Sequence, residues 1–285
     1  FFLYSVLIGL LFLLFYPLML ELINEWYGDP EFSHGFIIPV VSAYLLWIQR
    51  EKIVPKKSCW TTNQFSRGTP ILLIGGLLLF AFGRFLQHAF VQGIALIVVL
   101  AGLVLFLCGR KMLRVLLFPI GYLVFMLPIP HAVNLFFANQ LKYLIADSSG
   151  ALLSLAHVPV LLEGNTIHLA SISLEVVEAC SGMQTILSFL AIGAVFAYLG
   201  YHSILIQALV LILSIPMALA ANVLRVTAIG GLSYYFNNQV AHIFHGYAWT
   251  LIVLLGVLGF AAIDIVIRRY LAVRPAADSW APRIR

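Results

Sequence analysis

The chain alternates between long apolar stretches and short polar connections. Because backbone polar groups inside a bilayer must be satisfied within their own segment, apolar stretches of this length are expected to be helices. Some are shorter than the roughly 20 residues that cross a hydrocarbon core, so their boundaries are approximate. The pattern predicts an all-α polytopic integral membrane protein with about eight transmembrane helices, near 1–20, 36–48, 70–84, 89–107, 114–129, 182–199, 203–221 and 247–267.

Residues 130–181 form the longest stretch between two predicted spans. The first half repeats apolar residues at helical spacing with polar breaks, which predicts a helix lying at the membrane interface. In the second half apolar residues alternate on both sides of Gly164-Asn165, a pattern typical of a small β-hairpin. The mildly apolar, glycine-interrupted stretch 226–241 is expected to be a half-span or a surface helix.

Composition excludes a soluble domain and several enzyme classes. Of 285 residues, 62% are hydrophobic and 9% charged, whereas soluble domains carry roughly 25% charged residues. No composition shift marks a second domain, so one membrane domain is expected over 1–285. The absence of Walker, HExxH, GxSxG and Rossmann glycine patterns disfavours ATP-driven, zincin and serine-hydrolase functions. Residues 1–20 lack a basic n-region and a cleavage site, so we expect a retained helix there.

Charge along the chain predicts which side each loop faces. Thirteen of the sixteen basic residues fall on loops that eight alternating spans place on one side, namely 50–67, 110–114 and the basic tail 268–285. By the positive-inside rule this side is cytoplasmic. The opposite side receives the acidic segment 21–31 and the insert 130–181. We therefore expect a multi-pass membrane protein with a cytoplasmic C-terminus.

Cys180 lies at the predicted outer mouth of the span that begins near 182. A helix N-terminus carries partial positive charge and lowers the pKa of a thiol, and the following Ser181 and Gly182 leave the approach open. A small buried hydrophobe is the alternative interpretation of an isolated membrane cysteine. Cys59 and Cys108, beside basic loops, keep that interpretation.

Four further polar residues fall on the same predicted outer side. Arg225 follows the span 203–221, and an arginine at membrane depth is costly enough to indicate function, although it can also extend to the outer headgroups. Asn222 lies on the same helical face, three residues earlier. His242 and His245 precede the last span; each is also compatible with an interfacial ring, or with a metal pair that lacks a third ligand.

Together these side chains are the parts of cysteine acyl transfer. A thiolate attacks an acyl carbon, an imidazole takes and returns the proton, and a guanidinium donates to the developing oxyanion. The charge argument predicts the same membrane face for all of them.

At these residues the chain resembles the exosortase/archaeosortase family of membrane cysteine transpeptidases. The resemblance covers nearly the whole chain in order. The matching stretches are FSHGFIIPVVSAYLLW (32–47), MLPIP (126–130), EACSGMQTIL (178–187), ANVLRV (221–226) and YYFNNQVAHIFHGYAW (234–249).

The resemblance implies catalytic roles for Cys180, Arg225 and one late histidine. The family's late pattern runs Phe-His, three residues, then Gly-Trp; Phe-His at 244–245 fits its start, but Trp-Thr stands at 249–250. His242 has a glycine four residues on, so the assignment is open and we favour His245. The expected binding residues are Asn222, Glu178, Ser181 and His34.

The implied substrates are secreted proteins with a C-terminal sorting signal: a short motif typified by Pro-Glu-Pro, one transmembrane helix and a basic cluster. Many relatives are associated with exopolysaccharide systems. We expect membrane lipid as surroundings, no metal, cofactor or nucleic acid, and leave the oligomeric state open.

Two other classes compete. A transporter or channel would place charged groups or broken helices near the bilayer midplane, and Asp147, Asp264 and Pro216 are its candidates. A non-catalytic assembly factor for surface polysaccharide shares the topology and forms no covalent substrate adduct.

Overall fold

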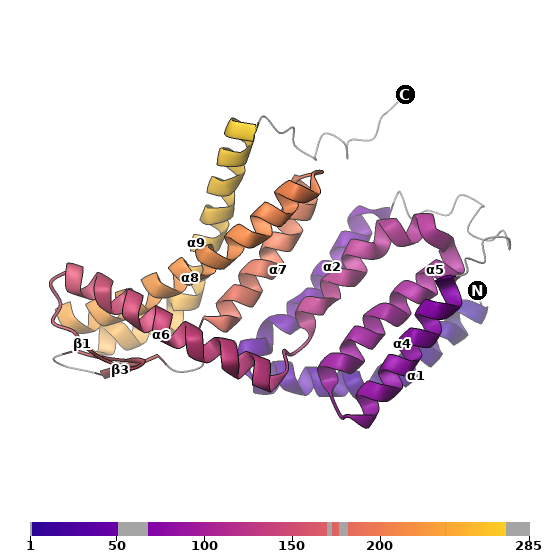
Figure 1. Ribbon diagram of the computed structural model, residues 1–285, viewed down its shortest axis with the longest axis horizontal. Helices are drawn as coiled ribbons and strands as arrows, with labels where there is room; N and C mark the ends of the chain where they lie inside the picture. The colour runs from indigo at the N-terminus through magenta and orange to yellow at the C-terminus, as the bar shows by residue number, and fades with distance from the viewer. Residues whose placement is uncertain (1, 51–67, 170–172, 177–181, 237, 272–285) are drawn as a thin grey trace. The chain divides into compact units, whose positions relative to one another are not determined.

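The computed structural model describes residues 2–50, 68–169, 173–176, 182–236 and 238–271 (Figure 1). The described chain separates into two compact units, Phe1–Pro130 and His131–Arg285. The predicted catalytic motifs all belong to the second unit, whereas the stretch that carries His34 belongs to the first.

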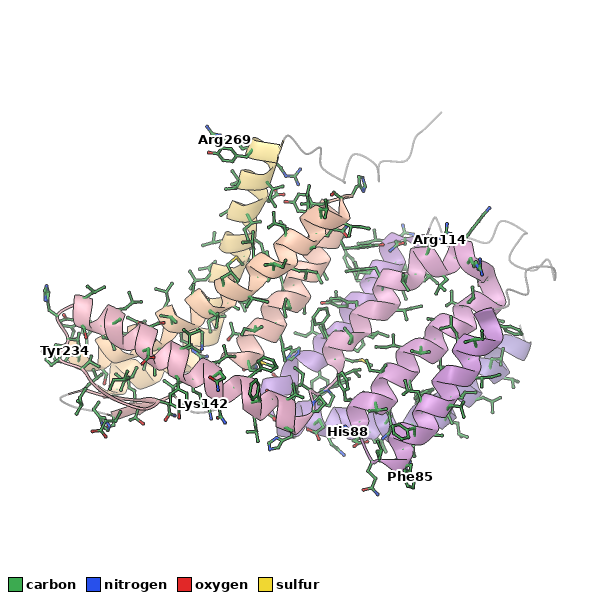
Figure 2. The ribbon with its side chains drawn as sticks, viewed as in Figure 1. Phe85, His88, Arg114, Lys142, Tyr234 and Arg269 are labelled. Carbon is green, nitrogen blue, oxygen red and sulfur yellow. The ribbon has the colours of Figure 1, made fainter. Side chains whose placement is uncertain are left out.

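The first unit is entirely helical in its described part. Its elements are α1 (Phe2–Gly28), η1 (Pro30–Phe36), α2 (Ile37–Ile48), α4 (Gly68–Phe85), α5 (Ala89–Tyr122) and η3 (Leu123–Met126). Two side-chain hydrogen bonds join distant elements: the Trp26 indole N–H donates to the Met126 carbonyl at 2.9 Å, and the Ser42 hydroxyl to the Pro119 carbonyl at 2.8 Å. In Figure 2, Phe85 and His88 lie at one end of this unit and Arg114 at the other.

The element α5 consists of two helical segments that meet at Gly109. This residue has φ 79° and ψ 179°, a backbone conformation that glycine adopts without a Cβ penalty. The break separates the two stretches predicted as spans at 89–107 and 114–129, and the basic residues Arg110 and Lys111 follow it directly. The two helical segments are therefore joined at Gly109 rather than by the expected connecting loop.

The second unit combines helices with a small sheet. Its elements are α6 (His131–Leu155), β1 (Leu161–Glu163), β2 (Thr166–His168), β3 (Ser173–Glu175), α7 (Met183–Gly200), α8 (Ile204–Tyr235) and α9 (Asn238–Leu271). Helix α8 packs against α6, α7 and α9, and the sheet lies beside α6 (Figure 1). Helix α8 is therefore the central element of this unit.

Two apolar clusters hold the second unit together. One joins α7, α8 and α9 through fully buried side chains that include Phe189, Val210 and Phe260. The other joins α6, the sheet and α8 through Ile145, Ile167 and buried neighbours. Inside a bilayer such side chains hold helices together by close van der Waals packing, because lipid tails are as apolar as the side chains themselves.

The sheet is antiparallel in the order β1-β2-β3. The hairpin predicted at Gly164-Asn165 is confirmed: Glu163 pairs with Thr166 across this two-residue loop. Gly164 has φ +63°, the left-handed conformation that glycine accepts at the first loop position of a type II′ turn. The alternating run after Gly164-Asn165 was expected to form one strand of the hairpin, and the structure instead forms two strands from it, β2 and β3.

The prediction of a polytopic helical membrane protein is confirmed. Among the described residues four helical stretches are long and apolar enough to cross a bilayer: Gly9–Gly28, Ala89–Met126, Met183–Gly200 and Ile204–Tyr235. Shorter apolar helices occupy Phe32–Ile48 and Ile71–Phe85. The number eight, and the side that each loop faces, stay predictions.

One expectation about the last third of the chain is wrong. Helix α8 does not end near 221 but continues through Pro216 and on to Tyr235. The stretch 226–241 is therefore no separate half-span, since most of it prolongs α8. Consequently Arg225 lies inside a long helix, ten residues before its end, rather than at a helix terminus.

Candidate functional site

The start of α7 requires a glycine on two counts. Gly182 is the N-cap residue with φ 83° and ψ −3°, and its carbonyl accepts the first helical hydrogen bond, from the Ile186 N–H at 2.9 Å. A Cβ added here would lie 2.9 Å from the Asn222 side-chain nitrogen and 3.1 Å from Ile145 Cδ1. The glycine therefore lets the Asn222 amide approach the backbone that leads into α7.

The predicted residues Glu178, Cys180 and Ser181 come directly before Gly182, and all three lie outside the described residues. The nearest described residue before them is Val176, which is 2% exposed. The Val176 N–H donates to the Asn165 carbonyl at 3.0 Å, and the Asn165 side-chain amide donates to the Val176 carbonyl at 3.0 Å. Val176 and Gly182, the described residues on either side of Cys180, are thus both held by hydrogen bonds.

Asn222 and Arg225 share one face of α8. Asn222 has no exposed surface, and Arg225 is half-buried with its Nε and Nη2 atoms shielded from solvent. Residues three apart on a helix are neighbours on its surface, so the guanidinium belongs to the same polar region as the amide. Holding an arginine partly buried in an apolar bundle is costly, which makes this region a candidate functional site.

The same part of α8 is held against α6 and the sheet. The Ser149 hydroxyl of α6 donates to the Val223 carbonyl at 3.3 Å. A Cβ at Gly230 would lie 2.9 Å from Leu153 of α6 and 3.4 Å from Leu174 of β3. These contacts set the depth of Arg225 relative to the strand that precedes Cys180.

His242 and His245 lie in the first two turns of α9, and their side chains are outside the described set. The backbone still orders them by depth. A Cβ at Gly259 would lie 2.7 Å from Met217 Sδ, so α8 and α9 run past each other in opposite directions from their short connection. His245 is therefore about one helical turn nearer to the level of Arg225 than His242 is.

His34 occupies η1 in the first unit. A Cβ at the neighbouring Gly35 would overlap the Trp26 indole, so this short helix is packed tightly onto α1. Its place beside Cys180 or Arg225 stays a prediction. Within the described part of the chain, no three His, Cys, Asp or Glu side chains come together as metal ligands.

A second polar cluster, not foreseen from the sequence as a cluster, lies at the other end of α7. The Tyr201 hydroxyl donates to Asp264 Oδ1 at 2.6 Å, and Arg268 Nε donates to Asp264 Oδ2 at 2.6 Å. Burial raises the pKa of Tyr201 above its usual value, and the hydrogen bond to Asp264 raises it further. Tyr201 therefore stays protonated as a donor. The i,i+4 spacing of Asp264 and Arg268 was the available sequence signal.

Fold and site together define a class: a polytopic helical membrane protein with a buried asparagine beside the start of a helix that follows a cysteine, and a half-buried arginine on the same helix face as the asparagine. A family comparison then gives the identity more closely. The family model described as transmembrane exosortase matches residues 26–260, and the chain belongs to this family. Searches of curated proteins and of solved structures returned no match.

Proposed function

We propose that the protein is a membrane cysteine transpeptidase. It removes the C-terminal sorting signals from secreted proteins and transfers the cleaved proteins to an acceptor. Family membership supports the activity class. The closeness of the Asn222 amide to Gly182 supports the assignment of this activity to particular residues. Since two residues of chain span at most about 7 Å, this contact brings the Asn222–Arg225 face of α8 near Cys180.

Each polar residue then has one role. The Cys180 thiolate attacks the carbonyl carbon of the scissile peptide bond, and Arg225 donates hydrogen bonds to the oxygen as it gains negative charge. His245 takes the thiol proton and returns it to the leaving amine when the carbon–nitrogen bond breaks. An acceptor nucleophile then attacks the thioester, loses its proton to His245 and releases the Cys180 thiolate. Asn222 orients Arg225 and the backbone at Gly182.

His245 is the better candidate base because of its depth. In the antiparallel pair of α8 and α9 it lies about one turn closer to the level of Arg225 than His242 does. A base must come within hydrogen-bond reach of its proton, directly or through one water. The proposal therefore assigns proton transfer to His245 and a supporting place to His242.

The proposal places this chemistry at the outer face of a bacterial inner membrane. Thirteen of sixteen basic residues fall on the loops that the prediction makes cytoplasmic, while the insert 130–181 falls on the other side. A secreted protein held by its own C-terminal helix would present its motif at that face. Glu178, Ser181 and His34 are proposed to contact this motif, and a motif of the Pro-Glu-Pro type with an exopolysaccharide link follows from the resemblance.

The charged groups that a transporter would use are placed differently here. Asp264 is bonded to Tyr201 and Arg268, and Asp147 is exposed on α6. Helix α8 continues through Pro216 instead of breaking there. These observations favour the enzyme over the transporter.

The decisive experiment is processing of a co-expressed protein with a C-terminal sorting signal, followed as a mass shift on a gel. Cys180→Ala should abolish processing, and Cys180→Ser should lower turnover by orders of magnitude because a hydroxyl forms its anion far less readily. Cys59→Ala and Cys108→Ala are the matched controls and should process normally. Normal processing by Cys180→Ala would leave the non-catalytic assembly factor as the surviving alternative.

A further inference from the structure

The strand β3 forms one edge of the described sheet, and its backbone N–H and C=O groups point alternately in two opposite directions. Leu174 pairs with Ile167 of β2, and the Val176 N–H bonds to Asn165 in the same register. Backbone groups alternate along an antiparallel strand, so Leu174 and Val176 point toward β2. The N–H and C=O of Ser173 and Glu175 therefore point away from the sheet.

Contacts on both faces of β3 hold this edge in place. Leu174 packs toward α8, where a Cβ at Gly230 would approach it to 3.4 Å. On the opposite face Ser173 is exposed, and its hydroxyl lies 2.8 Å from His168 Nδ1 on β2. Past the strand, the backbone hydrogen bond from the Val176 N–H to the Asn165 carbonyl continues the ladder by one residue, and the Asn165 side-chain amide donates to the Val176 carbonyl. A held strand keeps its outer backbone groups in a fixed direction.

The other edge strand, β1, is a poorer template. Leu161 and Glu163 pair with β2 in the alternating pattern that leaves the backbone groups of Leu162 pointing outward. It therefore offers one such residue, where β3 offers two, and Pro159 precedes it closely. Exposed strand edges pair readily with extended chains unless proline, lysine or a bulge blocks them, and β3 contains neither proline nor lysine.

We propose that an extended segment of the secreted substrate pairs with the outer edge of β3 as a fourth strand. This inference rests on the proposed function, in which Cys180 is the nucleophile. It is supported by the closeness of the two in the chain, since Glu175 lies five residues before Cys180. A peptide bound along β3 therefore lies within five residues of chain from the nucleophile. Recognition through main-chain hydrogen bonds makes affinity tolerant of side-chain identity, and the neighbouring residues supply specificity.

Proline substitution tests the edge without breaking the sheet. Ser173→Pro and Glu175→Pro each remove an outward N–H, and proline is tolerated at such edge positions. Ser173→Ala and Glu175→Ala are the matched variants, since they shorten the same side chains but keep the N–H. Because one hydrogen bond is worth about 0.5–1.5 kcal/mol net, each proline variant should bind substrate peptide up to about tenfold more weakly than its alanine partner.

The measurement is the binding of a fluorescent sorting-signal peptide to purified protein carrying Cys180→Ala, so that no chemistry intervenes. Equal affinities of the proline and alanine variants would overturn the proposal. Peptides N-methylated at successive backbone positions give a second measurement on the unsubstituted edge. Their affinity should fall at every second residue, and uniform tolerance would overturn the proposal even if the proline variants unfold.

The two proposals fail in different ways. Processing by Cys180→Ala would end the transpeptidase assignment, whereas the binding measurement does not depend on a nucleophile. Normal Cys180 reactivity with iodoacetamide in Ser173→Pro, in a background with Cys59→Ala and Cys108→Ala, would show that weaker binding comes from the edge and not from a damaged site.

Discussion

The two ends of α7 carry polar clusters of different character. At its C-terminal end, Tyr201 and Arg268 each hold one oxygen of the Asp264 carboxylate at 2.6 Å. At its N-terminal end, Asn222 is fully buried beside Gly182, and Arg225 lies half-buried one turn further along α8. Figure 2 shows Arg269 at the end of α9, far from Tyr234 and Lys142.

We expect the Asp264 cluster to stabilise the bundle and the Asn222–Arg225 cluster to serve the proposed reaction. Around Asp264 the opposite charges sit four residues apart on α9, an arrangement that the helix supplies by itself. Near Gly182 the half-buried Arg225 lies in an apolar bundle, where partial desolvation of its charge costs stability. Substitutions at the first cluster should therefore change stability, and substitutions at the second should change activity.

The largest expected contrast is in accessibility from outside the cell. In a variant without native cysteines, Leu161→Cys should react with a membrane-impermeant maleimide in intact cells, since Leu161 is 61% exposed in the insert. His202→Cys, at the Tyr201 end, should react only after permeabilisation. The reverse labelling pattern would contradict the topology and the outer position of the site together.

The two arginines give the next contrast. Arg225→Lys keeps the charge but loses the planar fork, so kcat/KM for cleavage of a sorting-signal peptide should fall by about 10²–10³-fold. Arg268→Lys makes the same change at the Asp264 cluster and should stay within a few-fold of the unsubstituted protein. Similar losses in both variants would remove the distinction between the clusters.

The histidines sharpen the assignment within the Gly182 end. His245→Ala should lower kcat by about 10²–10⁴-fold, the range of general acid–base catalysis. His242→Ala should have a smaller effect because it lies about one turn farther from the level of Arg225. If processing in cells is normal for His245→Ala and lost for His242→Ala, the base is His242.

The smallest expected effect is on stability at the Asp264 end. Tyr201→Phe removes a hydrogen bond to a carboxylate and should lower the free energy of unfolding by about 1.5–3 kcal/mol. Thermal unfolding in detergent measures this as a lower Tm, with kcat/KM unchanged. Tyr270→Phe, at a tyrosine that is 76% exposed, is the matched control and should leave Tm unchanged. An unchanged Tm in Tyr201→Phe would show that the cluster does not stabilise the bundle.

Local patterns predicted the regular elements well. Apolar stretches became helices because a bilayer leaves the backbone no other partners, and Gly164-Asn165 became a turn because glycine accepts φ +63° there. The helix expected in the first half of 130–181 is α6. The limits of α8 were missed because glycines at 230 and 231 resemble a break in sequence, whereas packing against Leu153 and Leu174 uses the missing side chain at Gly230.

The sequence alone determined the class of the protein, since 62% hydrophobic residues in spaced stretches admit no water-soluble core, and its motifs pointed to Cys180, Arg225 and a late histidine. Only the tertiary structure decided that Asn222 of α8 lies close to Gly182 at the start of α7, that Tyr201 bonds to Asp264 across 63 residues, and that β3 forms an edge of the described sheet. Contacts between residues far apart in the chain depend on how whole helices pack, and a local pattern of residues carries no record of that packing.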